Sequence, residues 1–201
     1  MENRKNQTAY LIWMCKIAMF AALMVALQLS GVGFIMTPWG SKITFNCMIV
    51  VVGTLAIDLK AGLMLAAIFG GFSTYTGIMN ADPYIAGPLL SWSPLAVAFL
   101  SIVPRMMIPV VTWLVKGAMT KTKLKPALQT GATAVAGSLT NTVLYLGTAF
   151  CLHLIRAENL QVLLTAIGLT GLLNGGLEAV LTALVAPPVV TALNGTGKKK
   201  K

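Results

Sequence analysis

The stretch Gly137-Ser138-Leu139-Thr140-Asn141-Thr142-Val143-Leu144-Tyr145-Leu146-Gly147 places small, hydroxyl-bearing and amide side chains in the middle of a long apolar run. In hydrocarbon, an unpartnered amide or hydroxyl group costs free energy, so these residues should face a neighbouring helix or a cavity. Two interpretations are open. Small and hydroxyl residues let helices pack closely, whereas Asn141 is also suited to line a binding site for a polar solute.

The chain around this stretch has the composition of an integral membrane protein. Of its 201 residues, 57% are hydrophobic and 10% are charged, against about 25% charged residues in a soluble domain. The net charge of +10 lies in short connections and in the tail, where membrane proteins carry topogenic lysines, so we predict no nucleic-acid partner. The three scattered cysteines and the single histidine indicate neither a disulfide framework nor a metal site.

The apolar runs predict an all-α membrane protein, a compact bundle of six transmembrane helices in one domain over residues 1–201. The basic N-terminus and first apolar run also resemble a signal peptide, but a run of about 20 apolar residues is long enough for a full membrane span. The long connections 30–44 and 79–94 are predicted to be loops, and Pro187-Pro188 should interrupt the last helix. The predicted helices cover residues 9–29, 43–57, 61–78, 94–119, 127–155 and 160–185, and a basic tail follows at 194–201.

The distribution of charge predicts the orientation of the bundle. Six spans put both termini on one side, and the basic residues gather in the termini and in the connections after the second and fourth helices. The opposite connections carry only Lys42 and Arg156. The positive-inside rule then makes both termini cytoplasmic.

Ionisable residues within spans are the first candidates for a functional site. Arg105 lies about eleven residues into its helix, or roughly 16 Å deep, and Asn141 lies at a comparable depth. Arg105 either pairs with Glu178 and joins two helices, or binds a substrate carboxylate with its permanently charged fork. The predicted substrate-binding residues are Asn141, Arg105, Thr140, Thr37, Trp39, Asn46, Trp92 and Tyr75, and the predicted structural or pairing residues are Glu178 and Asn174.

A second candidate surface lies on the first helix. Ala18, Ala22 and Ala26 recur every four residues, so they share one helical face and form a narrow ridge. Such a ridge permits close helix approach. It serves either internal packing or the docking of another membrane subunit.

Catalytic motifs are absent from the sequence. It contains neither Gly-x-Ser-x-Gly nor His-Glu-x-x-His, and it has no Gly-rich phosphate loop followed by Lys-Ser/Thr. We therefore predict that the chain is not an enzyme, holds no metal or cofactor and does not itself use ATP.

Several of these motifs together resemble the S components, the substrate-binding membrane subunits of energy-coupling factor (ECF) vitamin transporters. The resemblance covers nearly the whole chain. The features that carry the resemblance are the six predicted helices, the alanine ridge and three segments. The segments are Val103-Pro104-Arg105, Gly137-Ser138-Leu139-Thr140-Asn141-Thr142 and Gly175-Gly176-Leu177-Glu178-Ala179. The segments Pro38-x-Gly40-Ser41-x-Ile43-Thr44-Phe45 and Ser138-Leu139-Thr140-Asn141-Thr142 are most similar to the pantothenate-specific branch.

The resemblance implies a multi-pass protein of the bacterial cell membrane that captures a vitamin, here pantothenate, from outside. It implies docking through the alanine ridge on a transmembrane coupling subunit with two ATPase subunits, which use the ATP, and release of the vitamin inside. The alternatives are an S component for another vitamin such as riboflavin or folate, and a stand-alone secondary transporter. An intramembrane enzyme is a third class, for which no catalytic constellation is present.

Overall fold

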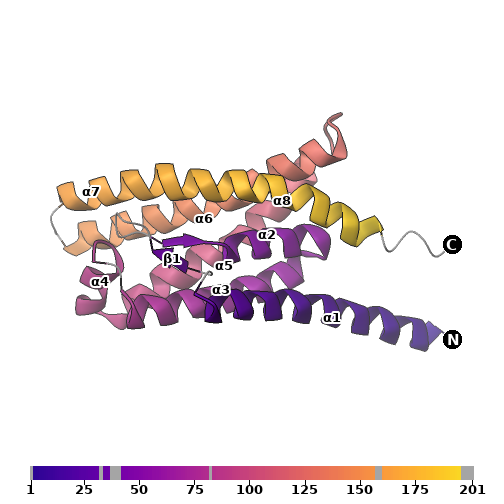
Figure 1. The fold of residues 1–201 in the computed structure, drawn as a ribbon, viewed down its shortest axis with the longest axis horizontal. Helices are drawn as coiled ribbons and strands as arrows, with labels where there is room; N and C mark the ends of the chain where they lie inside the picture. Colours follow the sequence, from indigo (N-terminus) through magenta and orange to yellow (C-terminus); the bar gives the residue numbers. More distant parts are fainter. Residues whose placement is uncertain (1, 32–33, 37–41, 82, 157–159, 196–201) are drawn as a thin grey trace.

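The computed structural model describes residues 2–31, 34–36, 42–81, 83–156 and 160–195, and it shows a bundle of long helices with one short hairpin (Figure 1). The elements are α1 (Glu2–Leu29), β1 (Phe34–Met36), β2 (Lys42–Thr44), α2 (Asn46–Ala56), α3 (Leu59–Met79), α4 (Ala86–Trp92), α5 (Pro94–Met119), α6 (Pro126–Arg156), α7 (Leu160–Leu169), the π-helical segment η1 (Thr170–Gly175) and α8 (Gly176–Gly195).

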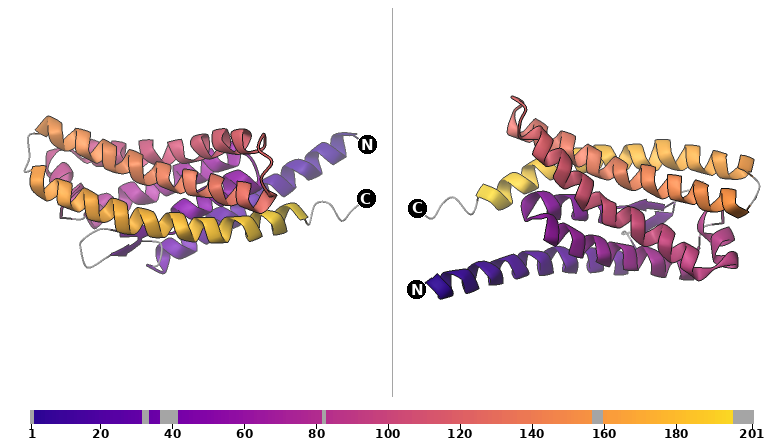
Figure 2. Two further views of the ribbon diagram at one scale, coloured as in Figure 1. Left: turned by 90° about the horizontal axis from the view of Figure 1, so that it is seen from above. Right: turned by 180° about the vertical axis from the view of Figure 1, so that it is seen from behind.

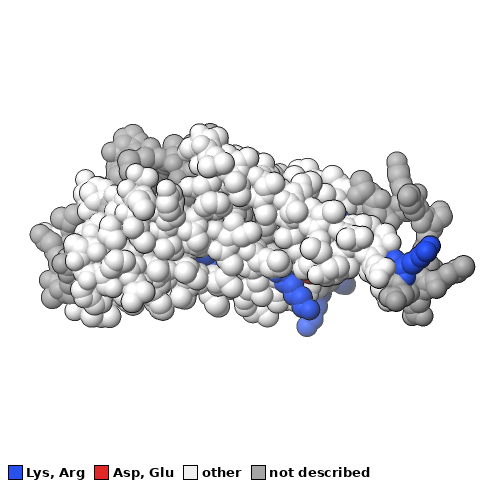
Figure 3. All heavy atoms as spheres, turned by 90° about the horizontal axis from the view of Figure 1, so that it is seen from below, with Lys and Arg blue, Asp and Glu red and all other residues white. Residues whose placement is uncertain are grey.

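Five helical stretches are long and apolar enough to cross a membrane. They cover residues 6–29, 59–79, 94–119, 126–155 and 170–195. The helix α2 has only 11 residues, and all of them except Met48 are buried, so the other helices enclose it. One face of the molecule is almost entirely uncharged (Figure 3). The structure is that of a helical membrane protein, as predicted, and the count of six spans stays a prediction.

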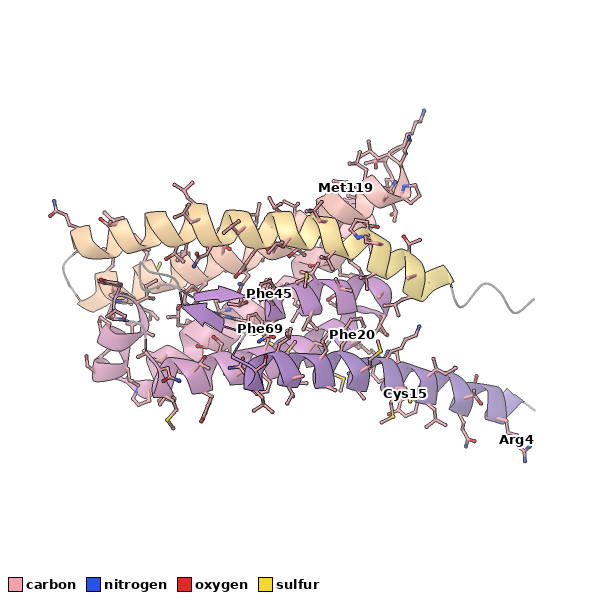
Figure 4. All side chains as sticks on the ribbon, viewed as in Figure 1. Arg4, Cys15, Phe20, Phe45, Phe69 and Met119 are labelled. Carbon is pink, nitrogen blue, oxygen red and sulfur yellow. The ribbon has the colours of Figure 1, made fainter. Side chains whose placement is uncertain are left out.

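The outermost helices lie on opposite sides of the bundle. Helix α1 runs along one side and α7, η1 and α8 run along the other, and the first turn of α1 and the last turn of α8 lie at the same end (Figures 1 and 2). The side chains of Ile17, Phe20 and Met24, on one face of α1, are buried in the core. Figure 4 shows Phe20 and Phe69 between the helices.

Local sequence signals explain where two of the spans begin. The Asp58 carboxylate accepts the backbone N–H of Ala61 at 2.7 Å and caps α3, and its other oxygen accepts the indole N–H of Trp13 at 2.8 Å. The Ser93 hydroxyl accepts the N–H of Leu95, with a proline at the first position of α5. Side-chain acceptors of this kind satisfy the free N–H groups at a helix start. The Trp13 bond also fastens α1 to the turn between α2 and α3.

The first long connection is not wholly a loop, which corrects the prediction for residues 30–44. Strands β1 and β2 pair antiparallel, with Phe34 opposite Thr44 and Met36 opposite Lys42. Because β2 takes residues 42–44, α2 begins at Asn46 rather than at the predicted residue 43. The strands are three residues each, too short for an alternating pattern to reveal them in the sequence.

The second long connection contains a helix, which corrects the prediction of a loop over 79–94. Pro88 lies within this segment and occupies the first turn of α4. A proline there removes only an N–H group that has no partner within the helix.

The last predicted helix, 160–185, differs in two ways. It passes through the π-helical segment η1, and it continues through Pro187 and Pro188 to Gly195. The prolines therefore do not end the helix as predicted. A proline within a membrane helix frees one carbonyl, and the helix continues where neighbouring groups compensate. The Thr191 hydroxyl donates to the carbonyl of Pro187 at 2.7 Å, in the turn that follows the prolines.

Candidate functional site

Five buried polar side chains from five segments lie in the interior of the bundle. Each is at most 6% exposed. They are Asn46 on α2, Arg105 on α5, Asn141 on α6, Asn174 on η1 and Glu178 on α8. A buried polar group is costly unless it is hydrogen-bonded, so the partners of each group indicate which atoms are available to a ligand.

Arg105 owes its position to the proline that precedes it. Pro104 has no N–H, so it cannot donate to the carbonyl of Leu100 four residues earlier. The Nη1 atom of Arg105 donates to that carbonyl at 3.0 Å. The guanidinium carbon lies 5.4 Å from the ring centre of Phe69 and 4.4 Å from that of Tyr145, distances at which the cation is attracted to an aromatic face. The Nε atom of Arg105 has no hydrogen-bond partner.

Glu178 is engaged by other parts of the protein. One carboxylate oxygen accepts the backbone N–H of Thr44 at 2.8 Å, which holds the end of the hairpin to α8. The side chain of Asn141 lies beside the Glu178 carboxylate. Among the described residues, to which Arg105 and Glu178 both belong, no ion pair joins the two. The predicted alternative of direct pairing between them is therefore not what the structure contains.

The two central asparagines each present an unpartnered carbonyl oxygen. Because a carboxylate is an acceptor, the amide nitrogen of Asn141 faces Glu178 and its Oδ1 atom points elsewhere, without a partner. The nitrogen of Asn46 donates to the side chain of Gln28 on α1 at 3.3 Å, and Asn46 Oδ1 is unpartnered as well. The hydroxyl of Thr44 is a further buried oxygen without a partner, and the side chain of Ser138 lies beside Cys47.

The arrangement can bind a small polar molecule. It offers a cationic N–H donor on Arg105 beside the rings of Phe69 and Tyr145, together with the amide oxygens of Asn141 and Asn46 and the hydroxyl of Thr44. Unsatisfied polar atoms at full burial are rare in folded proteins and call for an explanation. A ligand that supplies the missing partners is one such explanation.

Residues 13–190 match the family model of the substrate-specific component of ECF transporters. The chain belongs to this family. No curated protein matches it. It is therefore an S component: a multi-pass membrane subunit that binds a small substrate and works with an energy-coupling module, and not an enzyme.

Within the S component, two further predicted binding residues, Tyr75 and Trp92, lie on the exposed surface. Tyr75 is 60% exposed on α3 and Trp92 is 49% exposed at the end of α4. Thr140 is half-buried, and its hydroxyl donates to the carbonyl of Ala136 on its own helix. Thr37 and Trp39 lie outside the described residues. The structure thus brings together Arg105, Asn141 and Glu178 of the predicted residues, while Asn46 is buried on α2 and bonded to Gln28 of α1.

Several residues of the cluster had not been predicted. Gln28, Thr44, Phe69 and Tyr145 each touch one of the buried polar groups. Gln28 had a signal, because it is an uncharged amide near the end of an otherwise apolar span. Phe69 and Tyr145 carried no such signal in the sequence, because aromatic residues are common throughout apolar helices.

The alanine ridge of the S component lies on the outer side of α1. Ala18, Ala22 and Ala26 are all exposed, while the opposite face of the helix enters the core. The ridge is therefore not used for packing within the described part of the chain.

Proposed function

We propose that this S component binds pantothenate from the external side of the membrane and releases it inside after docking on an ATPase-bearing coupling module. One observation carries the proposal: Arg105 is buried, forms no direct ion pair with Glu178 and has an Nε atom without a hydrogen-bond partner. A buried cation is stable only when its N–H groups and its charge are matched at close range, and a ligand carboxylate at Nε supplies such a partner.

The rest of the cluster supports a solute of this size and chemistry. Pantothenate carries one carboxylate, one amide and two hydroxyl groups. The carboxylate suits the guanidinium of Arg105. The amide N–H and the hydroxyls can donate to the unpartnered oxygens of Asn141 and Asn46. Direct stacking on Trp92 or Tyr75 is not part of the proposal, because both lie on the exposed surface.

A panel of vitamins tests the ligand. Purified protein is titrated with pantothenate, riboflavin, folate and β-alanine by calorimetry. We expect tight binding of pantothenate alone. Binding of riboflavin or folate with no response to pantothenate would overturn the choice of ligand while leaving the family role intact.

The proposal includes six spans, both termini in the cytoplasm and docking through Ala18, Ala22 and Ala26. An exposed row of small residues supports docking, because it lets a partner helix approach closely. Ala22→Trp should abolish co-purification with the coupling subunit and leave vitamin binding unchanged. Leu114→Trp is the control, since Leu114 is exposed on a different helix, α5. Gradient-driven uptake by the chain alone, without ATPase subunits, would contradict the coupled mechanism.

A further inference from the structure

A groove on the outside of the bundle is not explained by substrate binding. It lies between α6 and α8, has a volume of about 630 Å³ and is lined by Lys125, Gly131, Val135, Ala183 and Pro187 among others. Apart from Lys125, every lining residue is apolar or glycine. The groove is built from small side chains, which leave space between the two helices.

The only charge at this groove is positive. Lys125 precedes α6, and Lys121 and Lys123 are exposed in the same turn. Among the described residues, no acid pairs with Lys125 and its ammonium makes no hydrogen bond. The acids Asp58 and Glu178 are engaged elsewhere, with Trp13 and Ala61 and with Thr44 respectively.

The length of the groove fits one leaflet of a bilayer. Lys125 and Val135 are ten residues apart, or about 15 Å along a helix. The hydrocarbon core of a membrane is about 30 Å thick, so the groove runs over half of it. Both flanking helices are candidate spans, so its apolar wall faces acyl chains rather than water.

We infer that this groove is a binding site for an anionic phospholipid of the bilayer, with one acyl chain along α6 and α8 and the phosphate beside Lys125. An apolar trench of one leaflet's length with an unpaired ammonium at its end matches the two parts of such a lipid. Basic pockets between membrane helices bind anionic headgroups for the same reason. This inference is independent of the identity of the vitamin.

Lipid retention tests the site. The protein is extracted from nanodiscs that contain equal amounts of phosphatidylglycerol and phosphatidylcholine, and native mass spectrometry counts the lipids that remain bound. We expect preferential retention of phosphatidylglycerol. Lys125→Gln should lower its affinity about fivefold, the effect of one lysine near an anionic surface. Lys121→Gln is the matched control in the same turn and should change it less.

A second variant tests the groove itself. A Cβ at Gly131 meets Ala183 O at 3.7 Å and Pro187 Cγ at 3.8 Å, which are ordinary contacts, so Gly131→Leu should fold and fill the groove. It should remove the retained lipid, whereas Gly147→Leu, at an exposed glycine of the same helix with open space around it, should not.

Two outcomes would overturn the inference. Equal effects of Lys125→Gln and Lys121→Gln would show that the turn attracts lipid only through its summed charge. If Gly131→Leu left lipid retention unchanged and blocked assembly with the coupling subunit, the groove would be a protein interface.

Discussion

Arg105 and Glu178 are both buried charges on membrane helices, but the protein treats them differently. Glu178 is hydrogen-bonded to the hairpin through the N–H of Thr44 and lies beside Asn141 of α6. Arg105 donates one nitrogen to the carbonyl that Pro104 leaves free, lies against two aromatic rings and has no hydrogen-bond partner at Nε. We therefore propose that Glu178 holds structural elements together, whereas Arg105 meets the ligand.

Arg105→Gln tests this comparison most strongly. The variant removes the cation that a ligand carboxylate would meet, and a truncated buried charge pair typically costs about 2–5 kcal/mol, so affinity should fall at least thirtyfold. Calorimetric titration with pantothenate measures it. Arg105→Lys should bind weakly too, because lysine lacks the planar fork and its stacking. Full affinity in both variants would remove Arg105 from the site.

Glu178→Ala should act mainly on stability. Losing the acceptor leaves the Thr44 N–H unsatisfied, at a cost of about 1–3 kcal/mol. The thermal unfolding midpoint in detergent should therefore fall. Glu178→Gln retains an oxygen for Thr44 and should stay near the wild-type midpoint. If Glu178→Gln lost ligand affinity as completely as Arg105→Gln, Glu178 would belong to the ligand site and the contrast would fail.

Asn46→Leu separates ligand binding from packing. It removes an oxygen that has no partner in the protein, so the unfolding midpoint should hold or rise. Affinity for the ligand should fall about tenfold, the usual size of one hydrogen bond. A large loss of stability with unchanged affinity would show instead that the Gln28 bond is what matters.

Pro104→Ala should give the smallest effect. The new N–H can donate to the carbonyl of Leu100. The hydrogen bond that holds Arg105 in its present rotamer is then no longer needed to satisfy that carbonyl. We expect a loss of affinity of a few-fold, measured by the same titration. Pro187→Ala, in α8, is the control and should leave affinity unchanged.

Periodicity and composition were sufficient for the long helices, because each apolar run carries its own signal. The start of α5 at Pro94 was predicted to the residue, and its preceding serine is the cap. The hairpin and α4 were missed since both are too short for periodicity to identify them. The continuation of α8 through Pro187 was missed because a proline ends a helix only when neighbouring groups fail to compensate.

The polar residues of the site were only partly predictable. Arg105, Asn141 and Asn46 stood out as polar side chains within apolar runs. Their partners did not, because the contacts of Arg105 with Phe69 and Tyr145 join three helices and depend on helix rotation. Thr140 was predicted to offer its hydroxyl to the ligand, and in the structure this hydroxyl donates to the carbonyl of Ala136 on its own helix.

The hydrogen bond from the Thr44 N–H to Glu178 allows the opening of the hairpin to be followed by hydrogen exchange. Thr44 ends β2, and α2 begins two residues later at Asn46. The amide proton of Thr44 is shielded from exchange with deuterium for as long as the hairpin rests on α8. Its exchange time, read in the presence and absence of vitamin and compared with Glu178→Ala, would report the opening of this single contact.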